Sequence, residues 1–136
     1  MDEGVSSLCD HGDDRKQFRH ERLEVWQASV DFAVDVYRLT LSFPPDERFA
    51  LSNQLRRASV SVSSNIAEGN GRTSGREKVR FIEIAYGSLM EVMSQLEIAQ
   101  RLNYINEEAV ARCRSTAFSI ARQLSALRSA IERRTP

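Results

Sequence analysis

Residues 54–72 read QLRRASVSVSSNIAEGNGR, and the fold class depends on whether this stretch is a strand or a helix. Val60 and Val62 alternate with serines as in a strand, but the wider region carries apolar residues at helical spacing. These are Leu51, Leu55, Ala58, Val62 and Ile66. A strand of about four residues between helical patterns would have nothing to pair with. We therefore predict a helix that ends at Gly69 and Gly71.

The sequence on both sides of this stretch is also helical in pattern. Pro44 and Pro45 stop the preceding helix, and Asp46 is a plausible N-cap for the helix that contains the opening stretch. Ser74 with Glu77 forms a capping box, and Asn106 is the N-cap expected for the last helix. The predicted helices span about 22–42, 46–69, 74–102 and 106–132.

Four amphipathic helices with short links predict an all-α, up-down-up-down four-helix bundle. The bundle occupies residues 20–136, and residues 1–19 form a polar tail with few apolar side chains. The last helix has the most regular apolar stripe, with spacings of three and four residues, typical of a bundle seam. Its members are Val110, Cys113, Ala117, Ile120, Leu124, Leu127 and Ile131.

The first helix carries two apolar stripes about 180° apart, at 100° per residue. One stripe contains Leu23, Trp26, Val30, Val34, Tyr37 and Leu41. The other contains Val25, Phe32, Val36, Leu39 and Phe43, which we take as the candidate subunit interface. Two apolar faces need two partners, so one faces the core and the other faces a further helix or another subunit. We favour contact with another subunit.

Composition narrows the class of protein. The 19 Lys and Arg balance the 19 Asp and Glu, so any electrostatic role depends on local clustering. Cys9 and Cys113 lie far apart and match neither a disulfide framework nor a zinc motif, so we expect free thiols. No apolar run is long enough for a signal-peptide core or a membrane span. We expect a cytoplasmic protein.

No combination of residues in the sequence supports catalysis or cofactor binding. His11 and His20 lie in or beside the tail, and the chain has no nucleophile elbow, phosphate loop or zinc-binding helix. Residues 9–14 contain cysteine, histidine and aspartates, but polar tails often hold such residues without a metal. We therefore expect no enzyme activity, no cofactor and no metal.

Positive charge clusters locally between residues 56 and 80. This 25-residue stretch contains Arg56, Arg57, Arg72, Arg76, Lys78 and Arg80. Arginines near helix ends can hold phosphate oxygens without reading base sequence. The alternative is that these cations only pair with nearby glutamates on solvated helices. We treat the six as candidate nucleic-acid contacts.

A polar motif follows in the same helix, formed by Asn65, Glu68 and Gly69. Asn65 and Glu68 lie one turn apart, and small Ser and Ala residues let neighbouring helices approach closely. Glu68 can accept hydrogen bonds from an arginine, and Asn65 can bond to the backbone. Since no partner base accompanies the carboxylate, we interpret this motif as structural rather than catalytic.

Several of these stretches resemble a known family in their order and spacing. They are LEVWQ (23–27), VYRLT (36–40), FPPDERF (43–49), QLRRA (54–58), SNIAEG (64–69) and GSL (87–89). They are similar to the four-helix-bundle proteins encoded in intervening sequences of bacterial 23S rRNA genes. The resemblance covers about residues 18–105.

The resemblance implies a four-helix bundle, commonly a homopentamer, that is not a known enzyme. The wider superfamily includes the accessory variability determinant of diversity-generating retroelements, a basic pentamer that binds nucleic acid and a reverse transcriptase. This chain differs from that branch in its zero net charge. With this resemblance we expect a non-catalytic, ring-shaped homo-oligomer, a pentamer, that contacts phosphates of structured RNA or DNA. The alternative is a protein-interaction scaffold without a nucleic-acid role.

Overall fold

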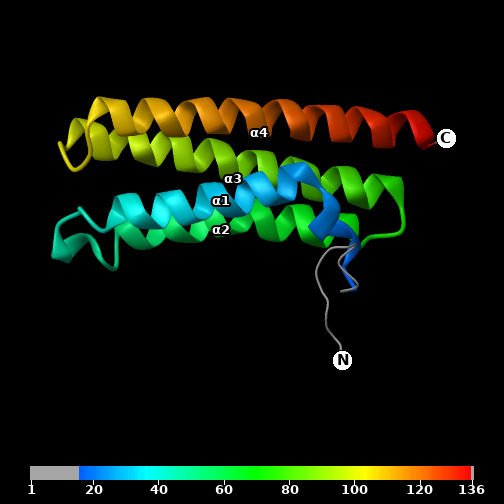
Figure 1. The fold of residues 1–136 in the computed structure, drawn as a ribbon, viewed down its shortest axis with the longest axis horizontal. Helices are drawn as coiled ribbons and strands as arrows, with labels where there is room; N and C mark the ends of the chain where they lie inside the picture. Colours follow the sequence, from blue (N-terminus) through cyan, green and yellow to red (C-terminus); the bar gives the residue numbers. More distant parts are fainter. Residues whose placement is uncertain (1–15, 136) are drawn as a thin grey trace, which may run out of the picture.

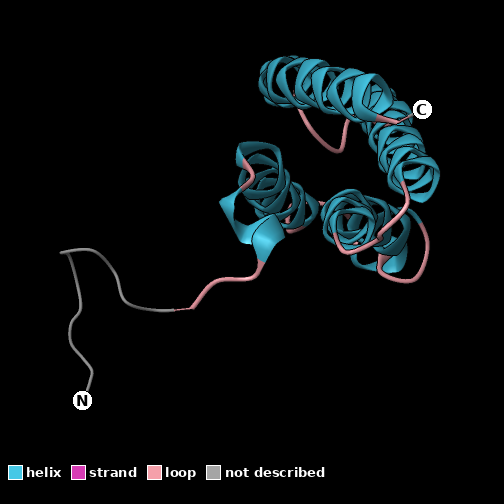
Figure 2. Cartoon of the chain, turned by 90° about the vertical axis from the view of Figure 1, so that its right-hand side faces the viewer, coloured by secondary structure: helices cyan, strands magenta, loops and turns pink. Residues whose placement is uncertain are grey.

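The computed structural model describes residues 16–135 and contains four long helices. They are α1 (Glu24–Thr40), α2 (Leu51–Asn70), α3 (Gly75–Arg101) and α4 (Glu107–Arg134). Two short 3₁₀ turns, η1 (Arg19–Arg22) and η2 (Pro45–Glu47), precede α1 and α2. Successive helices run in opposite directions (Figure 1), and seen along the bundle they surround a shared interior (Figure 2). No strand occurs between residues 16 and 135, which confirms the all-α four-helix bundle.

The opening stretch is helical, and its buried serines bond their hydroxyl groups to carbonyls of the same helix. Ser59 Oγ donates to the carbonyl of Arg56 at 2.9 Å, and Ser63 Oγ donates to the carbonyl of Val60 at 3.0 Å. Val62 is fully buried. The helical period therefore prevails over the local alternation of Ser and Val.

The observed helix ends confirm two of the predicted caps and correct a third. Ser74 Oγ accepts from the backbone N–H of Glu77 at 3.1 Å, and Asn106 Oδ1 accepts from that of Ala109 at 2.8 Å. Asp46 is not an N-cap, because it lies inside η2 and α2 begins only at Leu51. The prolines start the 3₁₀ turn η2 before the longer helix can begin.

The end of α3 is shaped by a left-handed residue, Asn103, with φ of 64°. The N–H of Tyr104 donates to the carbonyl of Ala99, and that of Asn103 donates to the carbonyl of Gln100, both at 2.9 Å. This pair of bonds is a Schellman motif, and asparagine tolerates the left-handed region well. The turn into α4 is thereby fixed without a glycine.

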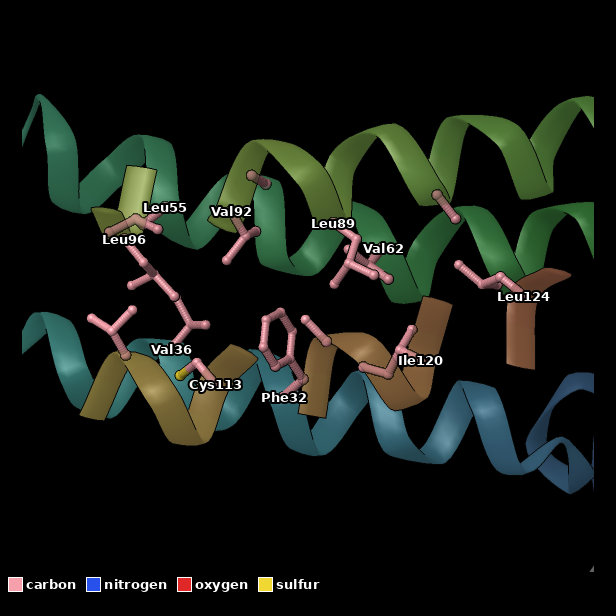
Figure 3. Packing of buried hydrophobic residues seen from close by; sticks show 14 of the residues in the cluster. Phe32, Val36, Leu55, Val62, Leu89, Val92, Leu96, Cys113, Ile120 and Leu124 are labelled. Carbon is pink, nitrogen blue, oxygen red and sulfur yellow. The ribbon is translucent and has the colours of Figure 1, made fainter. Parts of the chain in front are cut away.

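The core corrects the predicted subunit interface. Val25, Phe32, Val36 and Phe43 are buried within the single chain, and Leu39 packs against the same cluster. Figure 3 shows Phe32 and Val36 of α1 in the interior with Leu55, Val62 and Leu89 of the neighbouring helices. These side chains are not available to another subunit.

The opposite stripe of α1 is the one left to solvent. Val34, Tyr37 and Leu41 are exposed, with Leu41 at 76%. Helical periodicity gives the angle between two stripes but does not show which stripe packs against the rest of the chain. The prediction therefore assigned the core-facing stripe to the subunit interface. The apolar face that lacks a partner is Val30, Val34, Tyr37 and Leu41.

Candidate nucleic-acid interface

The six predicted cations do not form one patch. Arg56 lies near the start of α2 and Arg72 lies just beyond its end, and the 14 residues of helix from 56 to 70 alone correspond to about 21 Å at 1.5 Å per residue. Arg56 and Arg57 lie toward the end of the bundle with the α1–α2 and α3–α4 connections, whereas Arg72 lies at the end with the α2–α3 turn (Figure 1). Two separate environments therefore need to be considered.

Arg56 holds α1 against α2. Its Nε donates to Thr40 Oγ1 at 2.9 Å, and its guanidinium carbon lies 4.9 Å from the centre of the Tyr37 ring. Arg56 and Tyr37 border an apolar groove of about 490 Å³ between the two helices, which Val34, Leu41 and Val60 also line. Arg56, which the sequence analysis treats as a candidate nucleic-acid contact, thus also packs α1 against α2.

Arg72 and Arg80 lie near the same aromatic ring at the start of α3. Their guanidinium carbons lie 4.7 Å and 5.6 Å from the centre of Phe81. Arg72 pairs with Glu68 at 2.7 Å, and Arg80 pairs with Glu77 at 3.6 Å. These ion pairs are largely exposed and are worth at most about 1 kcal/mol each, so a phosphate can compete for the arginines.

The polar motif beside Arg72 joins α2 to α3. Asn65 Nδ2 donates to the carbonyl of Ser61 at 2.8 Å, and the Ser61 hydroxyl lies 2.9 Å from that of Ser88 on α3. A Cβ added to Gly69 would lie 2.7 Å from Cβ of Phe81, so glycine permits the close approach. These contacts fit the structural interpretation of Asn65, Glu68 and Gly69.

A basic pocket of about 580 Å³ lies between η1 and the α2–α3 turn. Among residues 16–135 its lining contains three cations, one histidine and no carboxylate: Phe18, Arg19, His20, Ala67, Asn70, Gly71, Arg72, Thr73 and Lys78. Lys78 Nζ donates to the carbonyl of Asn70 at 3.0 Å. Burial lowers the pKa of Lys78, and the nearby charge of Arg19 lowers it further. The repulsion between these two cations favours binding of an anion.

Arg76 lies in a second groove, on the side of α3 that faces the end of α4. This groove of about 480 Å³ also contains Arg80, Glu83 and Glu132. Arg128 pairs with both carboxylates, at 3.0 Å to Glu83 and 3.3 Å to Glu132. Positive and negative charges are balanced here, in contrast to the basic pocket.

Arg19 and His20 are site residues that the sequence prediction missed. They were placed in or beside the polar tail, and only the fold brings them next to Lys78, 59 positions further along the chain. The available signal was the charged run RHER immediately before the first apolar stripe. Such a run does not reveal its distant neighbour.

The zero net charge of the chain is unevenly distributed. Residues 1–15 contain five Asp and Glu but one Arg, so residues 16–136 hold 18 Lys and Arg against 14 Asp and Glu. The bundle therefore has a formal charge of +4, balanced by the acidic first 15 residues. The possible metal-binding run at residues 9–14 lies outside the described residues.

Other candidate chemistry is sparse in residues 16–135. No group of three or more metal-ligating side chains occurs there. None of the helices in this range has the length and apolar character needed to cross a membrane. Cys113 is a buried free thiol whose pKa is raised, chiefly by burial.

The fold defines an antiparallel four-helix bundle with a basic pocket at one end. A family model described as 23S rRNA-intervening sequence protein matches residues 21–126, and the chain belongs to this family. A crystal structure of a protein of unknown function from the S23 ribosomal protein family of Bacteroides thetaiotaomicron is similar in fold. The two are 24% identical with a TM-score of 0.69, over 76% of this chain and 97% of the other. No curated protein matches the chain.

Proposed function

We propose that this protein is a non-catalytic homo-oligomer that binds the phosphate backbone of RNA or DNA at the basic pocket. The observation that carries the proposal is the pocket lining, where Arg19, Arg72 and Lys78 come together and no lining residue between 16 and 135 is a carboxylate. Glu68, which pairs with Arg72, lies outside the lining. Cations in this arrangement bind phosphates by charge and position, without reading base sequence. The family description, with its link to 23S rRNA, is consistent with an RNA ligand.

The exposed stripe of α1 supports the oligomer in this proposal. Tyr37 and Leu41 border an apolar groove whose neighbouring walls include Val34 and Val60. Exposed apolar surface of this kind commonly marks a protein interface. Closed assembly around a symmetry axis would cover the groove and repeat the basic pocket once per subunit.

The same groove favours a second candidate function, a scaffold that recruits another protein. In that case the cations serve only the solubility and packing of the bundle. The two functions differ in their response to loss of the pocket charge, because only nucleic-acid binding depends on it.

The test is a double variant, Arg19→Ala with Lys78→Ala, in the full chain. A fluorescent RNA hairpin with an unpaired overhang is titrated at several salt concentrations, and light scattering reports the mass. We expect weaker binding and a log–log salt slope smaller by about 1.5–2, since two phosphate contacts are lost. The oligomer should be retained.

A matched double variant, Arg112→Ala with Arg122→Ala, removes the same charge elsewhere. Neither side chain makes an ion pair with any residue between 16 and 135. Equal weakening in the two double variants would show that only total charge matters. Absence of RNA binding in the wild type at low salt would refute the proposed function and leave the scaffold.

A further inference from the structure

Phe18 is an exposed aromatic residue held at the rim of the basic pocket. Phe18 is 74% exposed, but two hydrogen bonds with Glu21 hold its backbone in place. The N–H of Phe18 donates to Glu21 Oε1 at 2.9 Å, and the N–H of Glu21 donates to the carbonyl of Phe18 at 3.1 Å. An apolar ring in a fixed position, with most of its surface in water, is suited to stacking.

The ring belongs to a short aromatic array. The Phe18 and His20 rings are stacked, with centroids 6.2 Å apart and an interplanar angle of 11°. His20 in turn meets Trp26 edge-on, at 4.9 Å and 73°. The array supports Phe18 from one side, and the pocket with Arg19 and Lys78 lies directly beside it.

Aromatic rings next to cations are the combination that binds single-stranded nucleic acid, where bases stack and phosphates pair with charges. A base within a duplex has both faces covered by its neighbours and cannot stack on a protein ring. We infer that the basic pocket takes an unpaired nucleotide of a strand, with its base on Phe18 and its phosphate at Arg19 and Lys78. This inference rests on the proposed function and specifies its ligand.

The test compares three probes on the full-length protein. They are a short single-stranded RNA with 2-aminopurine at one position, the same strand annealed to its complement, and free AMP. Anisotropy of an end label gives the affinity for each RNA. Quenching of 2-aminopurine reports stacking, and fluorescence of Trp26, the only tryptophan in the chain, reports AMP entering the site.

The key variant is Phe18→Ala, with Phe18→Trp as the conservative replacement. The matched control is Phe49→Ala, because Phe49 is also exposed, at 85%, and has Arg48 at 5.7 Å from its ring. Phe49 lies just before α2, at the opposite end of the bundle (Figure 1). Circular dichroism confirms that each variant keeps its helical content.

We expect the wild type to prefer the single strand and to quench 2-aminopurine. Phe18→Ala should lose about tenfold in single-strand affinity together with the quenching, as for one stacked base, while Phe18→Trp and Phe49→Ala should not. Equal loss for single strand and duplex, or no loss beyond that of Phe49→Ala, would overturn the inference but not phosphate binding. AMP binding as tight as the strand would assign the site to free nucleotides, and no RNA binding at all would refute both proposals.

Discussion

Gly69 is the position where one added carbon should disturb the junction of α2 and α3. In Gly69→Ala, the new Cβ would lie 2.7 Å from Cβ of Phe81 and 3.5 Å from the carbonyl oxygen of Lys78. Carbon atoms pack favourably at about 3.5–4.0 Å. Cβ of Phe81 is fixed to the backbone of α3, so the helices themselves must move.

The magnitude follows from two opposing terms. Replacing glycine by alanine inside a helix stabilises it by about 1 kcal/mol. Gly69 is in the last turn of α2, so this gain is smaller there. Overpacking a close contact costs about 1–3 kcal/mol. We expect Gly69→Ala to lower the free energy of unfolding by about 1–2 kcal/mol, which is about 3–8 °C in Tm at this chain length.

Gly87→Ala is the matched control for this prediction. Gly87 is exposed within α3, and nothing lies within 4 Å of an added Cβ. This variant should gain up to about 1 kcal/mol from helix propensity alone. The difference between the two variants isolates the packing term, because the chemical change is identical.

Urea unfolding followed by circular dichroism measures both variants at one protomer concentration, because assembly makes the midpoint concentration-dependent. If Gly69→Ala gains as much stability as Gly87→Ala, then α2 and α3 are not in close contact and the argument fails. Displacement of Phe81 should also move the guanidinium of Arg72, so Gly69→Ala should weaken RNA binding as well.

Four further predictions concern the core, the exposed stripe of α1, a turn and the acidic residues 1–15. Phe32→Ala should lower the free energy of unfolding in urea by about 3–5 kcal/mol, because Phe32 is 1% exposed. Leu41→Asp should lower the particle mass measured by light scattering, because Leu41 lies on the exposed stripe of α1. The pKa of Tyr104 is raised, chiefly because its phenol donates to Glu47 Oε2 at 2.7 Å. This hydrogen bond should therefore stabilise the fold below about pH 10, and its contribution should be lost as the pH rises through the raised pKa of Tyr104. In Glu47→Gln the absorbance of the Tyr104 phenolate should develop at a lower pH than in the wild type. The last prediction concerns the five acids Asp2, Glu3, Asp10, Asp13 and Asp14. Replacing them by the corresponding amides should raise the affinity for RNA at low salt, as measured by anisotropy titrations, and this gain in affinity should disappear at high salt.

The helices could be predicted from the sequence because local and periodic signals agree. Ser74 and Asn106 satisfy the first amides of their helices, and apolar residues repeat at the helical period on each segment. Asp46 failed as a cap although it is a suitable residue type. The preceding prolines favoured a separate 3₁₀ turn, and sequence alone does not decide between these two local structures.

The basic pocket could be predicted only in part. Arg72 and Lys78 are close in sequence, so clustering alone found them. Arg19 joins them through the packing of η1 against α2, which is a tertiary contact without a periodic signature. The contact of Arg56 with the Tyr37 ring could not be predicted for a related reason, because that ring belongs to another helix.

Zero net charge is a weak argument against an electrostatic function in this chain. Charges in water are screened over about 8 Å at physiological ionic strength, whereas the part of α2 from Arg56 to its end at Asn70 is already about 21 Å long. A phosphate at the basic pocket therefore responds to Arg19, Arg72 and Lys78, and hardly to the acids near η2 at the other end. The arrangement of the cations therefore matters more for phosphate binding than their number in the whole chain, and the proposed assembly would repeat this local excess in every subunit.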